Sequence, residues 1–367
     1  MEPVGVVQVV HSLEVGGMER VAAHLAMHLG SPYKSLVICL TIPGHFAPQL
    51  EAAGIEVIAL NKKPGKDFGL PGRLAKILRE RRIRIVHAHN SGPMFTGTWA
   101  GLLARSNGII VTDHSRYFPE RPTVVATEMV LSRLVNEIVS VSEHNKQELV
   151  KRLHWPEKKI TVIPNGVEEI SEIDAATAGR LREEFGLTGD MPTLLTMARL
   201  EKQKNIGLLI QAMGELRKQG LDCRLIVGGE GAERETLERL RRECQLEDRV
   251  FLPGWRLDAA ALYRVVDIFA LPSDWEGLPM SILEAMSASL PILATDVGDV
   301  SKAVITRENG LLVTPRDLGQ MAAALAELVR DADKRRRFGV KSRDIWQQHY
   351  SVKGMARRYE ELYARYA

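Results

Sequence analysis

Residues 268–299, IFALPSDWEGLPMSILEAMSASLPILATDVGD, decide the fold class of the chain. Two short apolar runs, Ile268–Leu271 and Ile292–Ala294, flank a helical stretch, Ser281–Ser289. A strand, a helix and a second strand in this order predict a right-handed βαβ unit, in which the two strands are parallel. The loop that follows the first strand is polar, so we expect it to lie at the carboxyl end of a parallel sheet.

The same alternation of apolar runs and helical stretches extends outward over the whole chain. We expect strands at Val4–Val10, Ser35–Thr41, Glu56–Leu60, Ile83–Ala88, Gly108–Thr112, Glu137–Val141, Ile160–Ile163, Thr193–Ala198, Cys223–Val227, Val250–Leu252, Ile268–Leu271, Ile292–Ala294 and Leu311–Val313. Strands that alternate with helices form parallel sheets covered on both faces. The sequence therefore predicts an α/β protein with Rossmann-like parallel sheets.

A turn cluster near the middle divides the chain. Pro164–Val167 and the polar stretch that runs to Asp174 predict a linker between an N-terminal domain, 1–166, and a C-terminal domain, 167–345. The length of 367 residues also favours two domains over one core. Ligands of open α/β sheets bind at the carboxyl ends of the strands, so we expect a cleft between those ends of both sheets.

Composition excludes several classes of protein. Only three cysteines occur, widely spaced at positions 39, 223 and 244, which argues against a disulfide framework or a cysteine zinc site and favours the cytoplasm. We expect no signal peptide at the N-terminus and no membrane span. Residues 1–166 carry 20 Lys and Arg against 14 Asp and Glu, a net charge of +6, and the remainder is −3. This asymmetry is too mild for nucleic acid; it suits an anionic ligand or membrane surface, or is an ordinary solvated surface.

Two loops carry features that suit an anion. Gly16 and Gly17 follow the first strand, where backbone N–H groups at a helix start can approach an anion; the alternative is a tight turn. Arg199 and Lys204 follow the first strand of the second domain and could hold a diphosphate. Glu201 could instead pair with either cation.

Two carboxylates belong to the opening stretch. Glu276 lies in the loop, and Glu284 lies inside the following helix, eight residues later. Because its helix is otherwise apolar, the Glu284 carboxylate needs a hydrogen-bonding partner. The vicinal hydroxyls of a ribose would supply one, and a cation in the core is the alternative.

The Glu-x7-Glu stretch resembles the signature of the family 4 glycosyltransferases, which have the GT-B fold. Further segments resemble the same family in the same order along nearly the whole chain. They are Gly16-Gly17-Met18-Glu19, Val111-Thr112-Asp113-His114, Ile163-Pro164-Asn165-Gly166, Arg199 with Lys204, Val227-Gly228-Gly229-Glu230-Gly231 and Phe251-Leu252-Pro253-Gly254. The resemblance implies two Rossmann-like domains, and a C-terminal helix at about 346–367 that packs back onto the first.

For the second domain, the resemblance implies a donor site for a nucleotide sugar. Arg199 and Lys204 would bind the diphosphate, and Glu284 the ribose. Glu276 would act as a catalytic residue beside the transferred sugar. The backbone of Gly277, Leu278 and Met280 would also bind the sugar, and Gly254 would lie at the base; Pro279 has no N–H to donate.

For the first domain, the resemblance places Gly16 and Gly17 near the diphosphate and makes His114 the catalytic histidine. His87 and His89 alternate on one strand and share a face. His89 could contact the acceptor, and a structural role for both remains open; a metal pair is also conceivable, but we find no third ligand. Asp331-Ala332-Asp333 has the form of a D-x-D metal motif, yet it falls between two helices, so we expect it to bind no metal. The resemblance also implies an enzyme that needs no metal and no other cofactor.

The resemblance implies a retaining hexosyltransferase that moves a sugar from a UDP-sugar or GDP-mannose to an acceptor hydroxyl. We expect a saccharide or lipid-linked acceptor in polysaccharide or glycolipid synthesis, a peripheral membrane contact at the inner membrane surface, and no nucleic acid partner. The main alternative is a GT-B hydrolase or epimerase of nucleotide sugars. A dehydrogenase is the second alternative, but this sequence lacks the G-x-G-x-x-G motif that such an enzyme needs. A nucleotide-sugar-binding protein without catalytic activity is the third.

Overall fold

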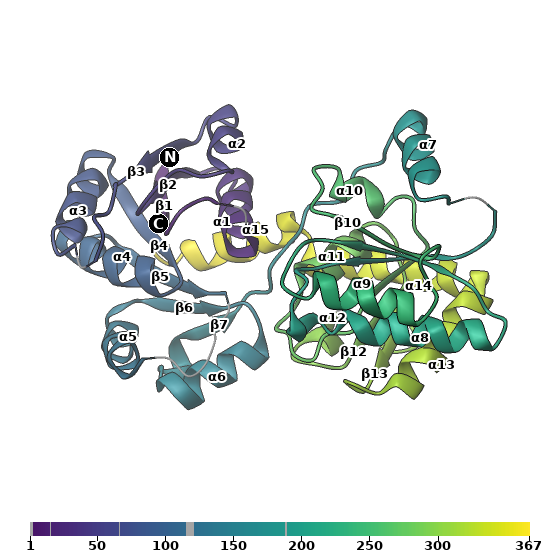
Figure 1. The fold of residues 1–367 in the computed structure, drawn as a ribbon. Helices are drawn as coiled ribbons and strands as arrows, with labels where there is room; N and C mark the ends of the chain where they lie inside the picture. Colours follow the sequence, from purple (N-terminus) through teal and green to yellow (C-terminus); the bar gives the residue numbers. More distant parts are fainter. Residues whose placement is uncertain (1–2, 15, 66, 115–120, 188) are drawn as a thin grey trace. The chain divides into compact units, whose positions relative to one another are not determined.

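The computed structural model describes residues 3–14, 16–65, 67–114, 121–187 and 189–367. The chain forms two compact units (Figure 1). Unit 1 comprises Met1–Gly166 and Val352–Ala367, and unit 2 comprises Val167–Ser351.

Unit 1 is built on a parallel sheet of seven strands in the order β3-β2-β1-β4-β5-β6-β7 among its described residues. The strands are β1 (Val4–Val10), β2 (Tyr33–Cys39), β3 (Glu56–Ala59), β4 (Ile83–His89), β5 (Gly108–Asp113), β6 (Glu137–Ser140) and β7 (Ile160–Val162). The helices are α1 (Gly17–His28), α2 (Ala47–Ala52), α3 (Leu70–Glu80), α4 (Ser91–Ala104), α5 (Pro122–Leu134), α6 (Glu143–Leu153), the short 3-10 turn η1 (Glu157–Lys159) and α15 (Val352–Tyr363).

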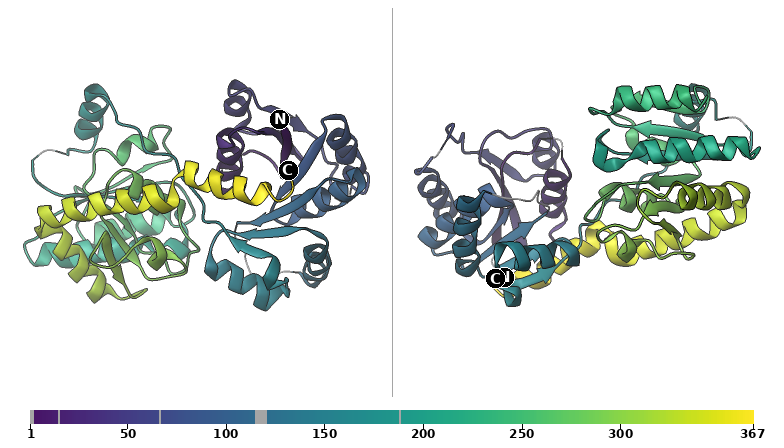
Figure 2. Two further views of the ribbon diagram at one scale, coloured as in Figure 1. Left: turned by 180° about the vertical axis from the view of Figure 1, so that it is seen from behind. Right: turned by 60° about the horizontal axis from the view of Figure 1, so that its bottom comes forward.

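The two faces of this sheet differ in character. On one face, Val7 and Val9 of β1 pack with apolar side chains of α3, α4, α5 and α6. Each such side chain that is fully buried contributes roughly 1.5–3 kcal/mol to stability. The other face carries α1, α2 and α15, and there the strands present polar residues beside apolar ones. Figure 2 shows α15 running alongside this sheet next to α1.

Unit 2 has a parallel sheet of six strands in the order β10-β9-β8-β11-β12-β13 among its described residues. The strands are β8 (Thr193–Met197), β9 (Arg224–Gly228), β10 (Val250–Gly254), β11 (Ile268–Leu271), β12 (Ile292–Thr295) and β13 (Gly310–Val313). The helices are α7 (Ala175–Glu184), the 3-10 turn η2 (Lys202–Lys204), α8 (Ile206–Lys218), α9 (Arg234–Glu243), α10 (Ala259–Leu262), α11 (Met280–Ser287), α12 (Val300–Ala303), α13 (Leu318–Arg330), α14 (Ala332–Ile345) and the π-helical turn η3 (Trp346–Tyr350).

The structure confirms two Rossmann-like parallel-sheet units, and it differs from the sequence prediction at the connections. The stretch predicted as a linker packs against unit 2 from Val167 onward. Val167 is buried in the core of unit 2, and Ile170 N donates to Ser287 Oγ at 3.1 Å. The helix predicted from about 346 is divided. Trp346–Tyr350 packs into unit 2, and only the following residues, α15, belong to unit 1.

Both sheets have a switch point, where the strand order reverses and ligands of open α/β sheets bind. In unit 1 it lies between β1 and β4, and in unit 2 between β8 and β11. The loops that follow these four strands begin at His11, Asn90, Ala198 and Pro272. Six of the predicted site residues lie in the loops after β1, β8 and β11: Gly16, Arg199, Lys204, Glu276, Gly277 and Leu278. No helix in the described parts of the chain is both long and apolar enough to cross a membrane.

Candidate functional site

The switch point of unit 2 brings Lys204 and Glu276 into contact. Lys204 ends η2 after β8, and Glu276 lies in the loop after β11. Lys204 Nζ lies 2.5 Å from Glu276 Oε1, and the two side chains are only 15% and 8% exposed. A charge pair so far removed from water is held firmly, because each partner would be costly to leave alone.

Neighbouring loops fix Glu276 in place. Ser273 Oγ donates to Glu276 Oε1 at 2.7 Å, and Thr295 Oγ1 donates to the Ser273 carbonyl at 2.5 Å. Gly298 has a φ of +55°, and a Cβ there would overlap the carbonyl oxygen of Glu276. Only glycine therefore lets the loop after β12 close onto the loop that carries Glu276.

Arg199 lies apart from this pair. Its guanidinium is 2.9 Å from Glu201 Oε1, and its side chain is 69% exposed. Of the alternatives for Glu201, the structure therefore shows the ion pair with Arg199. Each of the two cations predicted to bind a diphosphate already has a carboxylate partner, so an incoming diphosphate would compete with Glu201 and Glu276.

Glu284 lies on α11, the helix that follows the Glu276 loop. Tyr263 Oη donates to Glu284 Oε2 at 2.8 Å. Met280 and Ser281 begin α11, where the first backbone N–H groups of a helix have no partner within it. Glu284 and these donors therefore lie on one short helix.

The remaining donor residues lie at the same edge of the sheet. Gly277 is exposed, with open space where a Cβ would stand, and Leu278 is half-buried. Gly254 ends β10 with a φ of +81°, and its carbonyl accepts from Gly229 N at 3.0 Å. Gly254 is thus tied to the loop after β9 and lies two strands from β8.

The first loop of unit 1 differs from its expected form. Gly16 is the N-cap of α1, and a Cβ there would overlap Oε2 of Glu19. Gly17 is the first residue of the helix. A carboxylate of the chain itself therefore occupies the approach to Gly16, where we predicted an anion. An anionic ligand at this helix start would have to displace Glu19.

Three histidines form a buried cluster on one face of unit 1. His87 and His89 of β4 share a face, as predicted, and His114 follows β5. His89 Nδ1 lies 2.9 Å from His114 Nε2, and His89 Nε2 lies 2.9 Å from Gln8 Oε1. His89 is fully buried. The predicted direct contact between His89 and an acceptor would therefore require this side chain to become exposed.

The Gln8 amide determines the protonation of this chain of histidines. Gln8 Oε1 can only accept, so His89 Nε2 carries the proton and His89 Nδ1 accepts. His114 Nε2 then donates to His89, which leaves the lone pair of a neutral ring on His114 Nδ1. That nitrogen has no hydrogen-bond partner among the described residues. His114 Nδ1 is also buried, so a sugar hydroxyl could reach this acceptor only after the groups around it move.

Burial keeps the cluster neutral. Desolvation lowers the pKa of His114 to about 3, and it lowers that of His87 to about 3 with a further contribution from the charge of His114. The pKa of His89 falls well below its ordinary value, first through burial and then through its two neighbours. All three rings are therefore uncharged near neutral pH.

Two tyrosines of α15 complete the cluster, and the sequence analysis did not find them. Tyr363 Oη lies 2.6 Å from His87 Nδ1 and accepts from Gln8 Nε2 at 3.3 Å. His87 Nε2 is 2.7 Å from Thr112 Oγ1, which is 3.0 Å from Tyr359 Oη. The sequence held a signal for this cluster, since Gln8 is a polar residue within an otherwise apolar strand and Thr112 lies beside Asp113 at the end of another strand.

Asp331 and Asp333 have helix-terminal roles in the structure. Asp331 caps α14, where its Oδ1 accepts from Lys334 N at 2.8 Å and this bond lowers its pKa. Asp333 lies 3.5 Å from Arg336 on the exposed side of the helix. Among the described residues, no group of three or more His, Cys, Asp or Glu side chains is placed to hold a metal ion.

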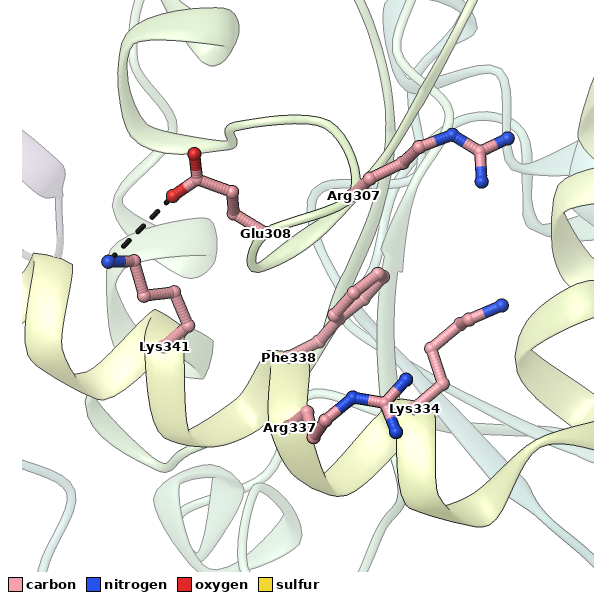
Figure 3. Close-up of a pocket in the computed structure, with 6 residues that line it drawn as sticks. All are labelled: Arg307, Glu308, Lys334, Arg337, Phe338 and Lys341. Atoms are coloured by element: carbon pink, nitrogen blue, oxygen red, sulfur yellow. Dashed lines mark ion pairs between the residues drawn. The ribbon is translucent and has the colours of Figure 1, made fainter.

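One pocket of unit 2, of about 380 Å³, is lined by basic residues but lies away from the donor residues (Figure 3). Arg307 and Glu308 precede β13 and so lie at the amino edge of the sheet. Lys341 pairs with Glu308 at 3.8 Å, and Lys334 pairs with Glu327 at 2.9 Å. The opposite edge carries Lys204 and Glu276.

Comparison with known proteins matches each of the two units to a family of glycosyltransferases. Residues 15–169 match the family described as Glycosyltransferase Family 4, and residues 178–344 match glycosyl transferases group 1. The chain belongs to the family 4 glycosyltransferases. It is similar to a solved glycosyltransferase from Rickettsia africae, with a TM-score of 0.87 and 19% identity over 100% of this chain and 99% of that one. It is also similar to Anabaena HepE in complex with UDP, with a TM-score of 0.85 and 21% identity over 99% and 100%. These likenesses confirm the GT-B fold.

Curated relatives of this glycosyltransferase have different names, and two of these names give a donor. The alpha-D-kanosaminyltransferase of Streptomyces kanamyceticus is 28% identical, over 78% of this chain and 81% of its own. A UDP-Gal:alpha-D-GlcNAc-diphosphoundecaprenol alpha-1,3-galactosyltransferase of Escherichia coli is 28% identical, over 70% and 69%. A GDP-mannose-dependent alpha-(1-6)-phosphatidylinositol monomannoside mannosyltransferase of Mycobacterium tuberculosis is 27% identical, over 75% and 75%.

Proposed function

We propose that this glycosyltransferase moves a hexose from a nucleoside-diphosphate sugar to the hydroxyl of a saccharide or lipid-linked acceptor, with retention and without a metal. The contact between Lys204 and Glu276 carries the proposal. It holds a cation and a carboxylate together at the switch point of unit 2, beside the start of α11.

Binding of the donor would rearrange the charges at this edge. Lys204 and Arg199 would turn from their carboxylate partners to the diphosphate, which is the stronger anion. The N–H groups of Met280 and Ser281 would add fixed donors to the sugar or phosphate. Together these groups would neutralise the departing nucleoside diphosphate, and such donors are each worth roughly 2.7–4 kcal/mol in other enzymes.

Retention is proposed to proceed by attack on the same face that the diphosphate leaves. Retention of the glycosidase type uses two carboxylates about 5 Å apart. Glu276 Oε1 is instead surrounded by Lys204 Nζ and Ser273 Oγ. We infer that Glu276 binds the hydroxyls of the transferred sugar, and that an oxygen of the departing phosphate accepts the acceptor proton.

His114 of unit 1 is proposed to bind a sugar hydroxyl. Its neutral ring and the lone pair on Nδ1 suit a hydroxyl donor, and they do not suit a phosphate. His89 and Gln8 would act as positioning residues, because they fix the tautomer of His114. The acceptor side would then lie in unit 1, and the donor side in unit 2.

The names of two relatives give different donors, UDP-galactose and GDP-mannose, so the nucleotide base of the donor is to be determined. A thermal-shift screen with UDP, GDP, ADP and CDP would identify the base. Turnover of the matching sugar donors would then be measured with and without a lipid-linked acceptor, and the anomeric configuration of the product by NMR. An inverted product would contradict retention, and equal turnover without an acceptor would make the protein a nucleotide-sugar hydrolase.

A further inference from the structure

Helix α4 exposes an uninterrupted apolar face. Residues 91–104 contain no charged side chain, and the exposed large side chains of the helix are Phe95 (37%), Trp99 (40%), Leu102 (42%) and Leu103 (56%). Their spacing of three and four residues places them on one side of the helix. A surface helix normally presents polar residues to water on that side, so this face, the α4 face, is unusual.

The inner side of α4 shows that the arrangement is specific. Thr96 and Thr98, two of its polar residues, are buried. A Cβ at Gly97 would lie 3.1 Å from the Ala88 side chain, and one at Gly101 would lie 2.8 Å from Ile109. These glycines seat the helix closely on β4 and β5. The helix cannot turn its apolar face inward, because the inner side is already fitted to the sheet.

Arginines surround the C-terminal end of the α4 face. Arg79 of α3 donates to the Leu103 carbonyl at 3.3 Å, and Arg105 is the C-cap of α4. The Arg84 carbonyl accepts from Asn107 N at 2.8 Å, which brings a third arginine to this end. Helix α3 and helix α4 are in contact (Figure 1). An apolar strip with an indole and a rim of arginines complements the acyl chains and phosphates of anionic lipids.

We propose that the α4 face lies on the surface of an anionic lipid bilayer. With 14 residues, α4 is shorter than the roughly 20 needed to span a bilayer, so it would lie in the plane of the interface. Phe95, Trp99 and Leu103 would enter the acyl region while the arginines bind lipid phosphates. This inference goes beyond the proposed transfer and does not depend on it, because the lipid contact is measured without a reaction.

The face also has a position that relates to the histidine cluster. Helix α4 begins directly after Asn90, whose Oδ1 accepts from His114 N at 2.9 Å. A bilayer contact along α4 would therefore bring the carboxyl edge of unit 1 to the lipid headgroups. An acceptor whose lipid part stays in the membrane could then present its hydroxyl near His114.

The first experiment measures flotation of the full chain with vesicles of phosphatidylglycerol and phosphatidylethanolamine, and with vesicles of phosphatidylcholine alone. We expect binding to the anionic vesicles. The double variant Trp99→Ser with Leu103→Ser should weaken it at least about tenfold, because two apolar anchors are lost. Val340→Ser, at an exposed apolar position of α14 in unit 2, is the matched control and should bind as the wild type does. Circular dichroism and thermal melting would verify that every variant is folded.

The second experiment locates the contact. Lipids with brominated acyl chains should quench tryptophan fluorescence in the wild type, and Trp99→Phe should lose most of this quenching while it still binds. Arg79→Gln with Arg105→Asn should reduce binding to anionic vesicles severalfold, and asparagine tolerates the left-handed backbone of position 105 (φ +57°).

Three outcomes would overturn the proposal. They are no flotation of the wild type with anionic vesicles, undiminished quenching in Trp99→Phe, and a dimer that the double serine variant dissociates. The last would make the α4 face an interface between two copies of the chain. Failure of the transfer proposal would leave the flotation result unchanged.

Discussion

Gln8 Oε1 lies 2.9 Å from His89 Nε2, and this one bond determines which nitrogen of His114 can accept a hydrogen bond. We therefore predict that Gln8→Leu lowers kcat at least about tenfold, since the wrong tautomer of a catalytic histidine is costly. The KM for the donor should stay within about twofold. Gln8→Glu keeps an acceptor oxygen and should retain more activity than Gln8→Leu in steady-state assays. Full activity of Gln8→Leu would refute the positioning role.

Glu284 and His114 should separate nucleotide binding from transfer. Glu284→Ala removes a carboxylate from α11 and should weaken the binding of free nucleoside diphosphate by about 10- to 150-fold, as expected for a lost hydrogen bond to a charged group. His114→Ala lies in unit 1 and should leave that binding within about threefold, while transfer falls about 100-fold or more. Calorimetric titration and a transfer assay test both. The assignment of roles fails if His114→Ala abolishes nucleotide binding, or if Glu284→Ala leaves it intact.

Lys204 and Arg199 should differ in their effect on stability. Lys204→Met leaves the buried Glu276 carboxylate without its ion pair and should lower the free energy of unfolding by about 1–3 kcal/mol. Arg199→Met removes an exposed pair and should change it by less than about 0.5 kcal/mol. Urea denaturation measures this difference. Both variants should bind nucleoside diphosphate more weakly, and equal losses of stability would contradict the burial of the Lys204 pair.

The histidine cluster predicts a pH dependence of stability. Burial lowers the pKa of His87 and His114 to about 3, so below pH ~6.5 the unfolded chain binds protons that the folded chain does not. Stability from this source is complete above about pH 6.5 and is lost as the pH falls toward 3, at up to about 1.4 kcal/mol per pH unit for each histidine. Urea denaturation between pH 7 and 4 should show this slope. His114→Gln should reduce it, and His45→Gln, at an exposed position, is the control.

Removal of divalent ions should leave transfer largely intact. In this structure, Asp331 already caps α14 and Asp333 pairs with Arg336, which accounts for the D-x-D sequence without a metal. Assays with and without EDTA test the prediction. Activity that is lost with EDTA and restored specifically by manganese or magnesium would contradict it, and Asp331→Asn would then show whether this motif is involved.

The strands and the family were predicted well from the sequence. The periodicity of apolar residues and the order of the motifs are both visible in the sequence itself. It placed Glu276 and Glu284 on the correct loop and helix, since an apolar helix with one carboxylate is visible in a single stretch. It did not predict that Lys204 pairs with Glu276, or that Glu19 lies against Gly16. Such contacts depend on how neighbouring loops pack, and that information is not contained in the spacing of either loop.

The histidine cluster was the larger omission. The alternation of His87 and His89 predicted a shared face correctly, but the depth of burial depends on what covers that face. The cover is α15, which is separated from β4 by more than 200 residues of sequence. Tyr359 and Tyr363 have the spacing of an ordinary amphipathic helix, so only the fold shows that they complete a polar network.

The position of α15 has a consequence for the order in which the protein can form. The residues that complete unit 1, Val352–Ala367, follow the whole of unit 2 in the chain. During synthesis on the ribosome, Gln8 and His87 emerge early, yet Tyr363 reaches them only after the entire second unit has been translated. The nascent first unit must therefore keep an unfinished face exposed until then. Truncation of the chain before α15, by a premature stop codon or by a protease, would therefore expose to water the histidines that are buried in the complete protein. The rest of unit 1 would still be present.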